Sequence, residues 1–150
     1  MIKEFQGRYR FLSNFWLCAI EYEGKIYPSV EHPYQAAKFS GQIYGPEIQE
    51  EIRNAKSPGE AKRIGKKNKH LVRKDWEQVN LGIMEVLVRQ KFTKFPELKK
   101  MLLETDNEYI QEGNWWNDEF YGYSFRSKKG LNHLGNILMK VRDEIRKEVV

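Results

Sequence analysis

Two long stretches of the chain carry apolar residues at helical spacing. Between residues 75 and 92 the apolar positions are Trp76, Val79, Ile83, Val86, Leu87 and Phe92. Between residues 131 and 147 they are Leu134, Ile137, Leu138, Val141 and Ile145. Each stripe predicts an amphipathic helix that packs one face on a core.

Helix start signals predict four shorter helices. Ser29 is a good N-cap, and Pro33 four residues later falls in the first helical turn, where its missing N–H costs little. Ser57 and Glu60 have capping-box spacing, with Pro at the first helical position. The shorter helices are expected at about residues 30–40, 46–53, 58–69 and 98–103.

The strand signals are fewer. β-forming segments at residues 18–22 and 25–27 flank Glu23-Gly24, which predicts a hairpin, and a further strand is expected at residues 108–111. Residues 113–129 form a loop-rich stretch dense in aromatic residues, Asn and Gly. The expected fold is α+β: mainly helical, with a small β-hairpin or sheet.

Composition supports one folded domain over residues 1–150, since 40% of the residues are hydrophobic and 13% aromatic. The single cysteine, Cys18, excludes an intramolecular disulfide and a multi-cysteine metal site, and we expect it in the core. The N-terminus lacks an apolar stretch of signal-peptide length. A cytoplasmic protein without a membrane partner is expected.

The chain has a formal net charge of +5, which favours anionic partners. Much of the excess gathers in residues 56–74, on and beside the predicted basic helix. A solvated helix face is the preferred interpretation of this cluster, and a nucleic-acid patch is the alternative.

Gln35 and Lys38 lie four and seven residues after Glu31, so on one helix the three side chains point the same way. A carboxylate, an amide and an amine would then line one wall of a site. Spacing alone favours the simpler alternative, an ordinary surface pairing of residues one turn apart.

Two further segments carry candidate chemistry. In the Gly-marked loop at residues 112–118, Trp115 and Trp116 could stack on a base or ribose. Equally, Trp115 and Trp116 could cover an apolar gap together with Phe120 and Tyr121. At residues 130–135 a glycine loop meets the last helix, where a phosphate could dock. Asn132 in that segment could instead be only the helix N-cap.

No metal or cofactor is expected. His32, His70 and His133 lack the spacing of a metal-binding motif. The sequence also lacks a phosphate-binding loop of the GxxxxGK[ST] kind, a GxGxxG fingerprint and a GxSxG elbow. Kinase, dehydrogenase and serine-hydrolase functions are therefore excluded.

Segments along nearly the whole chain resemble the NADAR family, also called YbiA-like. The matching segments are Phe11-Leu12-Ser13-Asn14-Phe15, Tyr27-Pro28-Ser29-Val30-Glu31-His32, Gln35-Ala36-Ala37-Lys38, Asp75-Trp76, Lys91-Phe92, Glu112-Gly113-Asn114 with Trp116 and Asp118, Tyr121-Gly122, Asn132 with Leu134-Gly135, and Leu138-Met139 with Arg142. The family usually has Trp-Gly where this chain has Tyr121-Gly122. The stretch at residues 123–129 is also longer and more basic than expected of the family.

The resemblance implies a YbiA-like fold and cleavage of a ribosyl C–N bond. Glu31, Lys38 and Asp118 would be catalytic: a carboxylate stabilises positive charge on the anomeric carbon, and an acid assists the departing nitrogen. Lys38 would trap the opened sugar as a Schiff base, or direct attack by water would replace this step. A nucleophilic Lys38 requires a depressed pKa, through burial or a cationic neighbour. The implied substrate-binding residues are Asn14, Phe15, His32, Gln35, Trp116, Tyr121 and Asn132.

Three functions stay open at this point. The leading one is a metal-independent N-glycosidase acting on a small phosphorylated ribosylamine of the riboflavin pathway. The second is an ADP-ribosyl-guanine glycohydrolase acting on ADP-ribosylated nucleic acid, favoured by the basic segment at residues 126–129. The third is a non-catalytic module that binds ADP-ribose or a related nucleotide.

Overall fold

The computed structural model describes residues 1–148. The chain divides into two compact units. The helical unit is Asn14–Lys91, and the sheet unit combines Met1–Ser13 with the chain from Phe92 onward. We describe each unit by itself, and the single domain expected for residues 1–150 stays a prediction.

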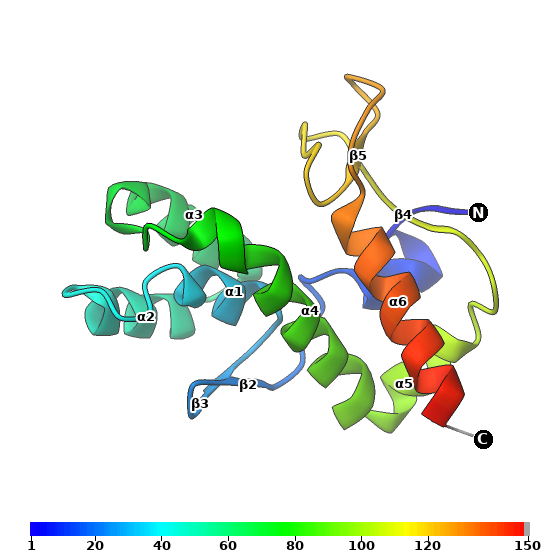
Figure 1. Cartoon of the computed structure of the whole chain (residues 1–150), viewed down its shortest axis with the longest axis horizontal. Helices are drawn as coiled ribbons and strands as arrows, with labels where there is room; N and C mark the ends of the chain where they lie inside the picture. The colour runs from blue at the N-terminus through cyan, green and yellow to red at the C-terminus, as the bar shows by residue number, and fades with distance from the viewer. Residues whose placement is uncertain (149–150) are drawn as a thin grey trace. The chain divides into compact units, whose positions relative to one another are not determined.

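The helical unit holds one hairpin and most of the helices (Figure 1). Its elements are β2 (Ile20–Tyr22), β3 (Lys25–Tyr27), α1 (Glu31–Ala37), α2 (Gly45–Arg53), α3 (Pro58–Lys67), the 3₁₀ helix η2 (Lys69–Leu71) and α4 (Trp76–Lys94), whose last residues belong to the sheet unit. The antiparallel pairing of β2 and β3 confirms the predicted hairpin, with Glu23 and Gly24 both at positive φ in the turn.

Helix α1 packs against both α2 and α3, and the three lie together in Figure 1. The predicted cap is confirmed, because the Ser29 Oγ accepts a hydrogen bond from the His32 N–H at 3.2 Å. The helix ends at Ala37, and the prediction that it reaches Ser40 is wrong. The backbone tightens there into bonds three residues apart, from Phe39 N–H to Ala36 O and from Ser40 N–H to Ala37 O.

The core of the helical unit forms where α1, α2 and α3 meet. Its buried residues are Tyr27, Ala36, Phe39, Ile48, Ile52, Ala55, Ala61 and Ile64. The Ser57 Oγ accepts from the Glu60 N–H at 3.1 Å, and the Glu60 carboxylate accepts from the Lys56 N–H at 3.0 Å. This arrangement confirms the predicted helix start, and the lysines and arginine of α3 lie on its exposed face.

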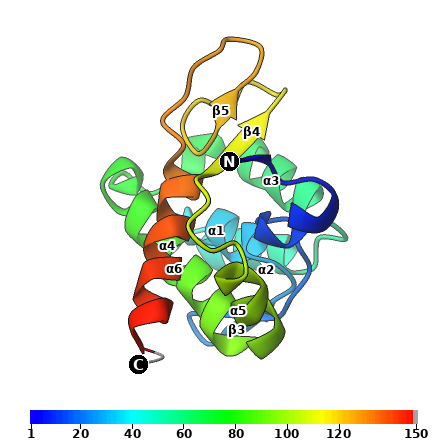
Figure 2. The same ribbon diagram turned by 90° about the vertical axis from the view of Figure 1, so that its right-hand side faces the viewer.

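The sheet unit is built around three short strands. Its elements are β1 (Ile2–Glu4), the 3₁₀ helix η1 (Gly7–Leu12), α5 (Pro96–Leu103), β4 (Ile110–Asn114), β5 (Tyr123–Ser124) and α6 (His133–Glu148). The strand order is β1-β4-β5, and both pairings are parallel. Helix α6 packs against β4 and α5, and Figure 2 shows β4 beside β5.

The fold class expected from the sequence is confirmed: helices dominate, and the strands form one hairpin and one small sheet. The expectation that Cys18 lies in the core is wrong, because its side chain is only half-buried. Within residues 1–148, no helix is long and apolar enough to cross a bilayer. Cytoplasmic localisation stays a prediction.

Lys91 in α4 is an ionisable group inside the fold, with 1% of its surface exposed. Burial lowers the pKa of its ammonium group from 10.5 to about 7, because the charged form loses its hydration. In the unfolded chain the amine keeps its proton up to its ordinary pKa. Between pH 7 and 10.5 the unfolded state therefore binds more protons than the folded state, and stability rises with pH.

We predict that Lys91→Met removes this rise in stability, which the pKa depression sets at about 5 kcal/mol across the window. Denaturant unfolding of wild type and variant at several pH values from 7 upward measures the difference in slope. Lys94→Met on the same helix is the matched control, since Lys94 is exposed. Equal slopes for wild type and Lys91→Met would show that the buried amine keeps an ordinary pKa.

Candidate active site

Glu31 and Gln35 lie on one face of α1 and are both buried, with 8% and 3% of their surfaces exposed. The Gln35 Nε2 donates to the Glu31 Oε2 at 3.5 Å, a long hydrogen bond. Their burial shows that the alternative of an ordinary surface pairing is wrong. A buried carboxylate beside a buried amide is instead an arrangement that can act on a bound molecule.

Lys38 follows α1 directly and is half-buried. Its Nζ lies 5.9 Å from the ring centroid of Tyr34 and 5.9 Å from that of Trp76, and the two centroids are 5.1 Å apart. Burial lowers the pKa of Lys38, with Glu31 acting to raise it and Lys62 acting to lower it further. The direction agrees with the expectation for a nucleophilic lysine.

Both ends of α1 are fixed by backbone hydrogen bonds. At the start, the Asn14 carbonyl accepts from the Glu31 N–H at 3.2 Å, while the Asn14 Nδ2 donates to the Met84 Sδ at 3.4 Å. At the end, the Lys38 carbonyl accepts from the Arg73 N–H at 2.8 Å. The backbone of Glu31 and that of Lys38 are therefore anchored at the two ends of α1.

The His32 ring links two segments of the helical unit through hydrogen bonds. Its Nδ1 lies 2.6 Å from the Ser29 Oγ, and its Nε2 lies 3.2 Å from the Ala55 carbonyl oxygen. Because a carbonyl oxygen only accepts, Nε2 carries the proton, and Nδ1 accepts from the serine hydroxyl. Burial lowers the pKa of His32, in keeping with a neutral ring.

Phe15, by contrast, is 45% exposed. Its ring is close to α3, since a Cβ added to Gly59 would be 3.9 Å from the Phe15 Cε2. That His32 and Phe15 bind substrate stays a prediction.

In the sheet unit, Asp118 organises the loop that contains it. Its Oδ1 accepts from the N–H groups of Phe120 and Tyr121 at 3.0 and 2.9 Å. Buried Asn114 pairs with the Asp118 backbone in both directions, at 3.0 Å to its N–H and 2.9 Å to its carbonyl. The catalytic role of Asp118 stays a prediction, and the structure adds a positional role.

The tryptophans of this loop face outward, with Trp115 61% and Trp116 57% exposed. The alternative that they fill an apolar gap is therefore wrong. Tyr121 is half-buried and edge-on to Phe120, with centroids 4.8 Å apart. A ligand could reach Trp116, so its stacking role remains a prediction consistent with its exposure.

The Asn132 side chain joins β4 to the start of α6. Its Oδ1 accepts from the Glu112 N–H at 2.9 Å, and its Nδ2 donates to the Ile110 carbonyl at 2.9 Å and to the Tyr109 hydroxyl at 3.2 Å. Asn132 occupies the N-cap position, because its carbonyl accepts from the Asn136 N–H at 3.0 Å. The prediction that its side chain caps α6 is wrong, since within the described chain that side chain bonds to Tyr109, Ile110 and Glu112 instead. Binding of substrate by Asn132 stays a prediction.

We predict that Asn132→Ala lowers the free energy of unfolding by about 2–4 kcal/mol. The change removes the hydrogen bonds that the Asn132 side chain makes to the Glu112 N–H and to the buried Ile110 carbonyl, and it places Ala at a φ of +53°. Chemical denaturation measures the loss. Asn136→Ala is the control, since exposed Asn136 makes one side-chain bond, at 3.4 Å to Leu131; equal small losses would contradict the role of Asn132.

Several residues that contact Gln35 or Lys38, or that influence Lys38, were not predicted from the sequence as part of the site. Tyr34 and Trp76 approach the Lys38 amine, Lys62 lowers its pKa, and Gly65 lies against Gln35. A glycine in the interior of a helix was the available signal for Gly65, because glycine weakens a helix by about 1 kcal/mol relative to alanine. The sequence placed Trp76 on the apolar stripe of the predicted helix at residues 75–92 and in a family motif, but gave it no role beside Lys38.

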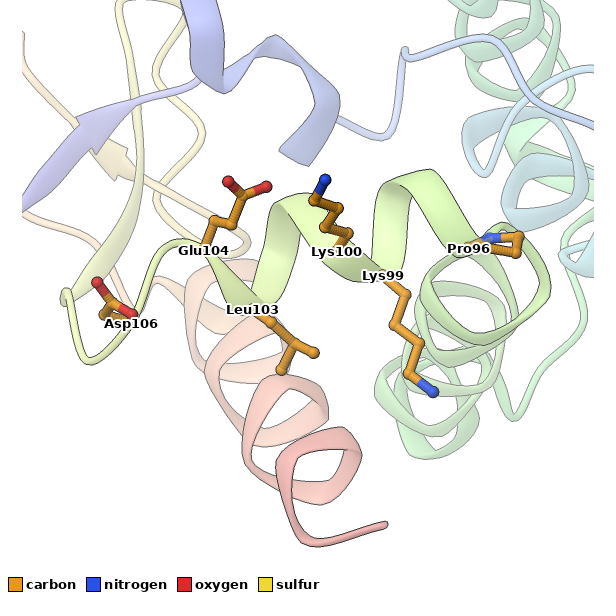
Figure 3. Close-up of a pocket in the computed structure, with 6 residues that line it drawn as sticks. All are labelled: Pro96, Lys99, Lys100, Leu103, Glu104 and Asp106. Atoms are coloured by element: carbon orange, nitrogen blue, oxygen red, sulfur yellow. The ribbon is translucent and has the colours of Figure 1, made fainter. Parts of the chain in front are cut away.

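A hollow of about 490 Å³ lies along α5 in the sheet unit (Figure 3). Its lining consists of Pro96, Lys99, Lys100, Leu103, Glu104 and Asp106. None of the predicted site residues is among them. Within residues 1–148, no group of three His, Cys, Asp or Glu residues could hold a metal ion.

The comparisons with known proteins define the class of this chain. The NADAR domain family matches residues 2–146. N-glycosidase YbiA of Escherichia coli is 36% identical over 141 residues, which cover 91% of this chain and 82% of that protein. N-glycosidase Npun_R5314 of Nostoc punctiforme is 38% identical over 138 residues, which cover 92% and 86%.

A third relative is the chloroplastic riboflavin biosynthesis protein PYRR of Zea mays, 42% identical over 126 residues. The match covers 79% of this chain, which spans about a fifth of that protein's length. Among solved structures, the NMR structure of E. coli YbiA superimposes with a TM-score of 0.84 at 35% identity. That superposition covers 99% of this chain and 87% of the other.

The chain is thus an enzyme of the class that hydrolyses N-glycosyl bonds. It belongs to the NADAR family, with the fold of E. coli YbiA. The alternative of a non-catalytic binding module is set aside on these relationships.

Proposed function

We propose that this N-glycosidase hydrolyses the ribosyl C–N bond of phosphorylated riboflavin-pathway intermediates, the ribosylamino-pyrimidine phosphates. The observation that carries the proposal is the buried Glu31 on the helix that presents Lys38, whose pKa burial lowers. The names of the relatives support the pathway, since they include N-glycosidases and riboflavin biosynthesis proteins.

The proposed reaction begins with attack by the neutral Lys38 amine on the anomeric carbon of the ribose. A new C–N bond to Lys38 forms while the bond to the pyrimidine nitrogen breaks, and the base leaves with a proton. Glu31 stabilises the positive charge that develops on the sugar. The proposed source of the leaving group's proton is the carboxyl group of Asp118.

Water then completes the cycle. The sugar bound to Lys38 opens to a Schiff base, and hydrolysis of that base releases ribose phosphate and restores the amine. The proton that the Lys38 nitrogen loses after its attack restores the Asp118 carboxyl group, so the net reaction consumes only substrate and water and requires no cofactor. Trp116, Tyr121, Asn14 and Asn132 are the proposed contacts to base, ribose and phosphate.

A second candidate is hydrolysis of ADP-ribosylated guanine in nucleic acid. The observation that favours it is the exposed basic segment with Arg126, Lys128 and Lys129, in a sheet unit that also exposes Trp115 and Trp116. Cations and exposed aromatic rings are what nucleic acid strands bind. A steep salt dependence of substrate binding would favour this candidate.

We predict that the purified protein releases ribose phosphate from a ribosylamino-pyrimidine phosphate, and that Lys38→Ala lowers kcat at least about 100-fold. The loss follows because alanine cannot form the covalent bond to the sugar. Substrate binding should change much less, since the other contacts remain. Quantifying product release and, separately, binding by calorimetry distinguishes the two effects.

The matched control is Lys67→Ala, which removes an exposed lysine of α3 and leaves in place both the nucleophile and Lys62, the neighbour that lowers its pKa. It should retain most of the turnover. If the protein turned over only ADP-ribosylated guanine DNA, the second candidate would replace the first. If Lys38→Ala kept full turnover, the nucleophilic role of Lys38 would be wrong.

A further inference from the structure

Gly65 occupies the interior of α3, on the face that is buried with Ala61 and Ile64. An interior glycine costs a helix stability, so its presence calls for a reason. The reason lies on the neighbouring helix, because a Cβ added to Gly65 would overlap the Gln35 Oε1 and would be 3.0 Å from the Gln35 Cδ. Only glycine leaves room for the Gln35 amide at this place.

The Gln35 amide occupies this space at a cost in stability. Its side chain is 3% exposed, and its Oε1 has no hydrogen-bond partner within residues 1–148. An unsatisfied buried acceptor weakens a fold. The other end of the amide, Nε2, donates to the Glu31 Oε2 at 3.5 Å. Seating the oxygen against Gly65 therefore turns the N–H toward the carboxylate.

We propose that Gly65 and Gln35 together form a positioning device for Glu31. Gly65 provides the space, Gln35 fills it, and the amide N–H orients the Glu31 carboxylate toward the reacting sugar. Gln35 then acts through Glu31 and not as a ligand of the substrate. The expected effect on turnover rests on the proposed function. The packing of the Gln35 amide against Gly65 is a structural claim that can be tested without it.

The positioning role has a physical consequence for catalysis. A carboxylate that stabilises charge at the anomeric carbon must be held in one orientation before the charge forms. A displacement of about 1 Å in such a group can cost about 100-fold in rate. Gly65 never needs to touch the substrate to have this effect.

The test is Gly65→Ala, which forces the end of the Gln35 side chain to move. We expect kcat to fall at least about tenfold, with KM changed less than about twofold because Gln35 does not bind the substrate. Thermal stability should hold, since alanine favours the helix and the overlapping group is the far end of a flexible side chain. The Gln35 side-chain amide signals in a ¹H–¹⁵N NMR spectrum should shift.

Gly82→Ala is the matched control. Gly82 lies within α4 and is exposed, and a Cβ added there meets nothing within 4 Å. The same substitution in a helix should therefore raise the melting temperature and leave both kcat and the Gln35 signals unchanged. The control separates the effect of alanine on helix stability from its effect on the position of the Gln35 amide.

Gln35→Ala and the double variant complete a cycle. If Gly65 acts only through Gln35, adding Gly65→Ala to Gln35→Ala should lower kcat no further. Additive losses in kcat would overturn the proposal, as would a KM that rises in step with the fall in kcat. Unshifted Gln35 signals in Gly65→Ala would refute the contact between Gly65 and the Gln35 amide, whether or not the enzyme acts on the ribosylamine. A wild-type protein that is inactive on the ribosylamine would count against the proposed function alone.

Discussion

The burial of α1 is the constraint on which the helical unit depends. All seven residues from Glu31 to Ala37 are buried, and three of them, Glu31, His32 and Gln35, are polar or charged. A buried polar group must find a partner or lower the stability of the fold. The surrounding segments supply these partners: Ser29 and Ala55 bond to the His32 ring, and the Asn14 carbonyl accepts from the Glu31 N–H.

Among the described residues, one buried side-chain atom lacks a hydrogen-bond partner, and it belongs to a residue of the proposed site. The Gln35 Oε1 has no hydrogen-bond partner in the described chain. Lys38 bears a pKa lowered by burial beside two aromatic rings. A fold designed only for stability would place a partner or an apolar side chain at such points. The lowered pKa of Lys38 runs in the direction that the proposed attack on an anomeric carbon requires.

Elements with a strong local signal could be predicted from the sequence. The Glu23-Gly24 turn and the capping residues Ser29 and Ser57 set their elements within a few residues of the prediction. The parallel sheet could not be predicted, because Ile2 pairs with Ile110 across most of the chain and β5 has only two residues. Strand pairing at such separation leaves no local pattern.

The candidate site, like the fold, could be predicted from the sequence only in part. The spacing of Glu31, Gln35 and Lys38 predicted a shared face, but spacing could not distinguish a buried face from an exposed one. Asn132 was a good N-cap by residue type, yet its side chain bonds to Ile110 and Glu112 of β4. The choice between such partners depends on tertiary packing.

The central claim is that Lys38 forms a covalent bond to the sugar during turnover. Borohydride reduction of a reacting mixture, followed by mass spectrometry of the peptides, tests it directly because reduction makes a Schiff base permanent. The account predicts a ribose-phosphate adduct on Lys38 that is absent from Lys38→Arg. Turnover without any adduct on Lys38, or an adduct on another lysine such as Lys91, would contradict it.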